Sequence, residues 1–119
     1  MKLTEEGRSD ALLSFVLREF ELHLFEKMHE DKPVEMEKED GYEPMVINPK
    51  DWKLSKDGKI ARADKKDFEF PRPMKKKIAG FYLTRPDEKP VLYLERFSDG
   101  PYDILRSGES VGVTVVLEK

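Results

Sequence analysis

The fold of this chain is decided by the stretch IAGFYLT-RPDEKP-VLYLERF, which runs from Ile78 to Phe97. Both ends of the stretch are rich in aromatic and aliphatic side chains, which fit a pleated and half-buried surface. The middle, Arg85–Pro90, has the charged, proline-containing composition of a turn. The stretch therefore predicts two antiparallel strands, Ile78–Thr84 and Val91–Phe97.

The same pattern continues toward the C-terminus. Residues 111–117, VGVTVVL, alternate between the two faces of a strand, and the apolar odd-numbered side chains share one face. A short strand at Tyr102–Leu105 and a turn at Arg106–Ser110 are predicted just before them. These segments form a second pair of strands.

Shorter strands are predicted upstream. Residues 52–60 place Lys-Asp-Gly between alternating side chains, which predicts a tight hairpin with Gly58 at positive φ. Asp67–Phe70 and Tyr42–Ile47 are two further strand candidates, and Pro44 suits the second to a sheet edge.

The N-terminal part changes from helical to strand periodicity. Ser9–Glu19 is predicted to be an amphipathic helix with a broad apolar arc, and Phe20–Phe25 a half-buried strand that points His23 outward. Residues 26–41 are highly charged. They are predicted to form a long exposed loop, with at most a short extended piece at 34–36.

These elements predict a mostly β fold. Seven or eight short strands separated by turn signals are typical of an antiparallel β-sandwich or barrel, here with one N-terminal helix. The chain of 119 residues has room for one such domain.

Composition narrows the class of protein. The chain has no cysteine, no apolar run of the roughly 20 residues that span a bilayer, and no start resembling a signal peptide. We therefore expect a protein made in the cytoplasm that does not enter a membrane. A net charge of −3 argues against nucleic-acid binding as its main role.

The charges are unevenly distributed. Residues 26–43 hold eight acidic and three basic residues, whereas residues 50–77 hold eleven basic and five acidic ones. Two solvated faces would explain this. Alternatively, the acidic edge of one copy meets the basic edge of the next, and such head-to-tail contacts close into rings such as trimers. The candidate subunit contacts are Glu35, Glu37, Glu39, Asp40, Lys65, Lys66, Arg72, Lys75, Lys76 and Lys77.

No residue pattern announces an active site. The only histidines, His23 and His29, do not have the spacing of a triad or of a zinc site, and both are expected in solvent. The run Lys75–Lys77 either grips phosphates or protects a sheet edge. We predict no enzyme activity, cofactor or metal. The aromatic residues that could form a sugar-binding platform, or else pack in the core or between subunits, are Trp52, Tyr82, Tyr93 and Tyr102.

The order of these features resembles a family of short structural proteins of tailed-phage virions, often labelled tail-fibre-like or minor virion proteins. The resemblance covers about residues 9–118. It rests on the ordered set Ala11–Leu17, Phe20–Phe25, Gly41-Tyr42, Trp52, Phe68-Glu69-Phe70-Pro71, Ile78–Leu83, Val91–Leu94 and Ser107–Val111.

The resemblance implies a non-enzymatic subunit of a bacteriophage virion, tail-associated or head-decorating. Its partners would be copies of itself and other virion proteins, and its mechanism would be assembly. The alternative is a β-sandwich module that binds a glycan or a host surface. A hydrolase built on a pair of carboxylates is a third hypothesis.

Overall fold

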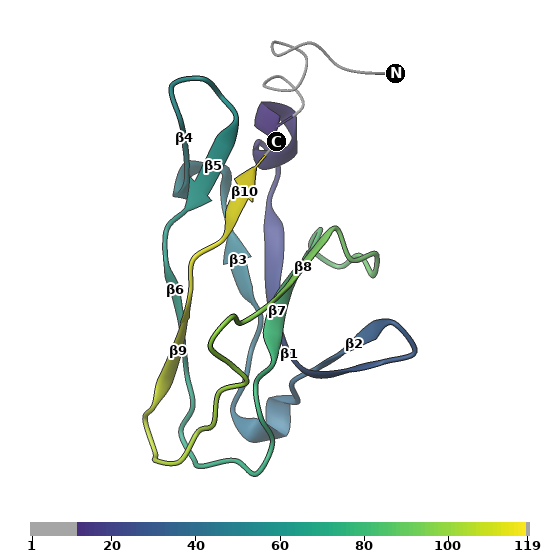
Figure 1. The fold of residues 1–119 in the computed structure, drawn as a ribbon, viewed down its shortest axis with the longest axis vertical. Helices are drawn as coiled ribbons and strands as arrows, with labels where there is room; N and C mark the ends of the chain where they lie inside the picture. The colour runs from purple at the N-terminus through teal and green to yellow at the C-terminus, as the bar shows by residue number, and fades with distance from the viewer. Residues whose placement is uncertain (1–11, 119) are drawn as a thin grey trace.

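One layer of the structure is a five-stranded antiparallel sheet centred on β1 (Phe20–His29). The computed structural model describes residues 12–118 (Figure 1). β7 (Gly80–Thr84) pairs along one side of β1, and β8 (Tyr93–Arg96) pairs with β7. The antiparallel pair predicted between residues 78 and 97 is therefore confirmed.

The other side of β1 is shared by two short strands. β3 (Met45–Ile47) pairs with the start of β1, and β2 (Lys32–Glu35) pairs with its end. A 3₁₀ turn, η1 (Lys38–Asp40), lies between these two strands in the chain. The sheet thus has β8 at one edge and β2 with β3 at the other.

The second layer is a long, bent ribbon. One arm is β5 (Ile60–Ala63) followed by β6 (Lys66–Glu69). The other arm is β9 (Ser110–Val113) followed by β10 (Val116–Glu118), so that β6 pairs with β9 and β5 with β10. Figure 1 shows the two arms running side by side along the length of the molecule.

A β-bulge interrupts this ribbon. Arg62 lies opposite Val116, and Lys66 lies opposite Val113. Between these two pairs the β5–β6 arm advances by four residues and the β9–β10 arm by three. One extra residue is therefore left on the β5–β6 side. The predicted single strand at residues 111–117 is divided at the same level, with residues 114 and 115 outside regular pairing.

β4 (Trp52–Leu54) joins the edge of β5, and the 3₁₀ turn η2 (Pro49–Asp51) leads into it. Gly58, between β4 and β5, has φ of 70°. The predicted hairpin with glycine at positive φ is confirmed.

The hydrophobic core lies between the two layers, as in a β-sandwich. From the sheet, β1 and β7 present alternate side chains, and every second residue of the C-terminal arm is buried against them. The predicted inward face of residues 111–117 is confirmed. Core residues of both layers include Phe20, Leu22, Leu24, Phe81, Leu83, Ala61, Ala63, Phe68, Phe70, Val111, Val113, Val115 and Leu117.

The prediction that residues 26–41 form a long exposed loop is wrong. β1 continues to His29, turns through Glu30 and Asp31, and returns as β2. Glu30 has φ of 50° and Asp31 φ of 63°, so these two residues form the turn in the left-handed conformation. The expected strand at Tyr102–Leu105 is also missing, since only Tyr102 makes a bridge, to Ile78.

The predicted N-terminal helix is confirmed in part. Residues 12–16 are helical, and residues 9–11 of the prediction lie outside the described part of the chain. The helix ends before Glu19. Leu12 and Val16 face the core, whereas Leu13 and Leu17 are exposed. Within residues 12–118, no helix is long and apolar enough to cross a membrane.

Arg85 explains where this helix ends. Its guanidinium donates hydrogen bonds to the carbonyl oxygens of Phe15, Arg18 and Glu19, at 3.0, 3.3 and 3.2 Å. It also lies 4.2 Å from the centre of the Phe20 ring. A residue predicted as part of a turn is thus a buried anchor that satisfies the free carbonyls after the helix.

Candidate functional site

The outer face of the sheet, away from the ribbon, carries a cluster of buried polar side chains. His23 on β1 stacks on Tyr82 of β7, with ring centres 4.6 Å apart. Its Nδ1 lies 2.7 Å from Glu35 Oε2, and its Nε2 lies 3.0 Å from Thr84 Oγ1. The Tyr42 hydroxyl donates to the same Glu35 oxygen at 2.7 Å. Side chains from β1, β2 and β7 thus meet around one imidazole ring, and Tyr42 joins them through Glu35.

The prediction that His23 lies outward in solvent is wrong. The strand alternation is correct, because Leu22 and Leu24 face the core and His23 faces away from it. That outer face is nevertheless covered at this point, since Glu35 and Tyr82 contact the ring, and His23 is only 6% exposed. His29, by contrast, has an exposed side chain, as predicted.

The hydrogen bonds of this cluster set the charge of its members. Burial raises the pKa of Glu35, but hydrogen bonds from His23 and Tyr42 outweigh burial and hold that pKa below its usual value. Burial raises the pKa of Tyr42 and of Tyr82 above the usual range, and nearby Glu35 adds to the rise. The glutamate is therefore the ionised acceptor, and both tyrosines remain neutral donors.

The cluster does not form a metal site. Glu35 faces Nδ1 of His23, whereas Glu21 Oε1 lies 3.2 Å from Nε2 on the other side of the ring. The two carboxylates therefore do not converge on one point. Within residues 12–118, no three His, Cys, Asp or Glu side chains are placed to hold a metal ion.

A groove lies next to the cluster on the same face. It has a volume of about 550 Å³, and Tyr82 and Leu94 line it together with residues of two neighbouring turns. Asp31, Lys32 and Pro33 come from the turn between β1 and β2, and Lys89, Pro90 and Val91 from the segment before β8. Because Tyr82 also stacks on His23, the cluster supports one side of the groove.

No family model, curated protein or solved structure matches this chain.

The predicted acidic contact residues do not act as one surface. Glu35 belongs to the His23 cluster. Glu37 and Asp40 each lie 3.2 Å from Lys76 Nζ, and Arg72 donates a hydrogen bond to the backbone carbonyl of Glu39. The acidic segment and part of the basic segment are thus in contact within a single chain.

The remaining predicted basic residues are spread over the ribbon and its lower turn. Lys66 lies 3.2 Å from Asp51, and Lys65 lies 3.5 Å from Asp67. Lys77 lies 4.0 Å from Asp103, at the outer limit of an ion pair. Lys75 is exposed and makes no ion pair within the described residues.

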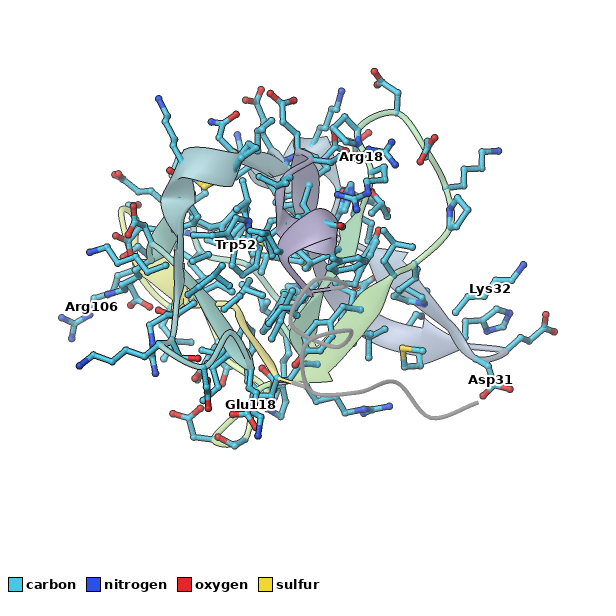
Figure 2. All side chains as sticks on the ribbon, turned by 90° about the horizontal axis from the view of Figure 1, so that it is seen from above. Arg18, Asp31, Lys32, Trp52, Arg106 and Glu118 are labelled. Carbon is cyan, nitrogen blue, oxygen red and sulfur yellow. The ribbon has the colours of Figure 1, made fainter. Side chains whose placement is uncertain are left out.

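The four aromatic residues suggested as a sugar platform lie apart. Trp52, labelled in Figure 2, is buried and its ring packs against Phe20. Tyr93 packs on Phe81 and Tyr102 on Phe97. Only Tyr82 lines a groove next to two lysines.

Sequence reasoning missed Tyr42, Thr84 and Arg85 as site residues. Tyr42 and Thr84 were placed on strands, and a pattern of alternate residues does not reveal which side chains share a hydrogen bond. Thr84 has one usable signal. It is a polar residue next to Arg85 at the end of a wholly buried strand, where a buried polar group requires a partner.

Proposed function

We propose that this chain is a non-enzymatic structural subunit of a bacteriophage virion that acts by assembling with neighbouring subunits. The observation that carries the proposal is the position of exposed apolar side chains on sheet edges. Val46 lies on β3 and Leu54 on β4, and Leu92 directly precedes β8. All three strands are edges within the described sheets.

Sheet edges of this kind favour pairing with another chain. An edge strand presents unpaired N–H and C=O groups, and monomeric proteins usually protect it with charge or proline. Here apolar residues occupy or adjoin three edges instead. The sequence resembles phage structural proteins, so the particle in which we expect such pairing is a phage virion.

A comparison of three variants tests the assembly role. Val46→Lys and Leu54→Lys place a charge on an edge strand, so we expect each to lower the average mass measured by sedimentation equilibrium. Leu105→Lys is the matched control, because Leu105 is 72% exposed but lies on no strand. Equal masses for all variants and for the unmodified chain would remove the edge argument.

The virion itself is tested separately. Particles are banded from a lysate of cells that carry the gene, and their protein content is measured by mass spectrometry. We expect this chain in many copies per particle. If the chain stays in the supernatant, the viral role is wrong, and self-association is judged from the sedimentation measurements alone.

The groove beside Tyr82 supports a second candidate, a glycan- or host-surface-binding module. Its volume lies within the roughly 300–1,000 Å³ typical of ligand sites, and it combines apolar walls with Lys32 and Lys89. A glycan array probed with the unmodified chain and with Lys89→Glu tests this candidate. Lys56→Glu, on the exposed β4–β5 turn, is the control. Binding that only Lys89→Glu abolishes would favour this role over a purely structural one.

A further inference from the structure

Beyond Phe25, β1 and its partner β2 form an arm with which no third strand of the described sheet pairs. β7 pairs with β1 only as far as Phe25, which lies opposite Gly80. Beyond that point, residues 26–29 pair with β2 alone. Figure 1 shows this hairpin extending sideways from the body, and Figure 2 shows Asp31 and Lys32 at its far end. We call residues 26–35 the arm.

The tip of the arm is acidic and conformationally costly. Glu30 and Asp31 both have positive φ, which costs roughly 1–2 kcal/mol for a residue such as glutamate and less for aspartate. A chain that needed only a turn would place Asn-Gly there. The Glu30 side chain is 84% exposed, and its one ion pair within residues 12–118 is a 4.0 Å contact with Nε2 of the neighbouring, also exposed His29. Two carboxylates are therefore presented at the far end of a projecting hairpin.

A basic groove lies at the base of the same arm. It has a volume of about 460 Å³ and is lined by Lys27, Lys77 and Arg96 around Met28 and Phe97. Glu26 is its only acidic residue. Within residues 12–118, the one ion pair of these cations is the 4.0 Å contact of Lys77 with Asp103, and both of those side chains are largely exposed. The groove therefore keeps a positive charge that is little compensated.

The tip cannot reach this groove in its own chain. The groove is lined by Glu26, Lys27 and Met28, two to five residues before the tip on a strand that rises roughly 3.3 Å per residue. An extended strand cannot fold back over that distance. A second copy of the chain can supply the tip, and its charge is complementary.

We propose that Glu30 and Asp31 at the tip of one copy bind the groove formed by Lys77 and Arg96 of another copy. The inference rests on the proposed assembly role and names the contact that would produce it. The contact joins two different surfaces, so it gives a reciprocal pair or a ring where the rotation closes, and an open filament where it does not. Because its charges lie near the surface, it weakens as salt is added.

Charge reversal tests the contact. Glu30→Lys with Asp31→Lys gives the tip variant, and Lys77→Glu with Arg96→Glu gives the groove variant. Each places like charges at the contact, so we expect at least tenfold weaker self-association by sedimentation equilibrium at low salt. A chain with all four changes has opposite charges again and should associate like the unmodified chain.

The matched control is Asp87→Lys with Glu88→Lys. These residues also lie on an exposed turn, and Asp87 has a φ of 60°, close to that of Asp31. The control should associate normally. Circular dichroism and thermal unfolding show whether each variant is folded, and an unfolded groove variant is replaced by Arg96→Glu alone.

The outcomes separate this inference from the assembly role. If the unmodified chain associates and the tip variant associates equally well, the tip contact is wrong but assembly stands. If both variants lose association and the fourfold variant does not regain it, the pairing of tip with groove is wrong. If the unmodified chain is monomeric at all concentrations and absent from particles, both proposals fail.

Discussion

The two halves of β1 lie in different environments although they form one continuous strand. Residues 20–25 pair with β3 or β7 and contribute the fully buried Phe20, Leu22 and Leu24. Residues 26–29 pair only with β2, and Lys27 and His29 are exposed. The first half has its apolar side chains buried within the chain, whereas the second half carries exposed side chains and pairs with one short strand.

This difference predicts that stability and the proposed self-association can be changed separately. A substitution in the first half should unfold the chain before it affects any partner. A substitution in the second half should affect the partner and leave unfolding almost unchanged. The predictions below test that separation, starting with the largest effect.

Leu24→Ala should lower the free energy of unfolding by about 3 kcal/mol, because it leaves a cavity at a fully buried position. Met28→Ala, four residues further along the same strand, should cost less than about 1 kcal/mol, since that side chain is only partly buried. Urea unfolding followed by circular dichroism measures both. Similar losses would mean that the arm belongs to the cooperative core.

Arg85→Ala should cost about 2 kcal/mol, because three carbonyl oxygens at the end of the N-terminal helix lose their donor. Arg85→Lys is the control, since it keeps the charge but cannot reach three oxygens with a planar group. We expect it to recover less than half of the loss. The same urea titrations give the result, and full recovery would mean that charge alone matters.

Glu35→Gln should cost about 1 kcal/mol at pH 7, a low value for a charged hydrogen bond because the Glu35 side chain is 37% exposed. The folded chain holds the pKa of Glu35 below the value of roughly 4.3 expected when unfolded. The stabilisation is therefore complete above that pH and is lost as the pH falls through the folded pKa. The difference between the two chains should shrink below about pH 4. A difference that grows on acidification would contradict this sign.

Glu30→Asn with Asp31→Gly should raise stability by about 0.5 kcal/mol, since both new residues tolerate left-handed backbone better. The same change removes both acidic groups from the tip, so it should weaken self-association. Thermal unfolding and sedimentation on one sample measure the two effects. A more stable chain that associates less well would be the sharpest form of the contrast along β1.

The strands of the core could be predicted from sequence because their signal is local. The alternation at Val111–Leu117 and the glycine turn at Gly58 each depend on neighbouring residues. The strong strands at Gly80–Thr84 and Tyr93–Arg96 are likewise rich in residues that favour strands.

The arm and the polar cluster could not be predicted in this way. The turn at Glu30-Asp31 lacks the glycine or asparagine that marks a two-residue hairpin, so its charged residues were interpreted as a loop. The burial of His23 depends on Glu35 and Tyr82, which arrive from other strands. Sequence periodicity gives the face on which a side chain lies, but not what covers that face.

At residues 64–65, the bulge in the ribbon makes the number of residues more important than their identity. Before residues 64–65 the buried residues are odd-numbered, Ala61 and Ala63, and after them they are even-numbered, Phe68 and Phe70. The facing strands, β9 and β10, keep their odd-numbered residues inside throughout. Deleting a single codon there would turn one of the two pairs toward water. Homologues of this chain should therefore tolerate substitutions at residues 64 and 65 but not the deletion of either residue.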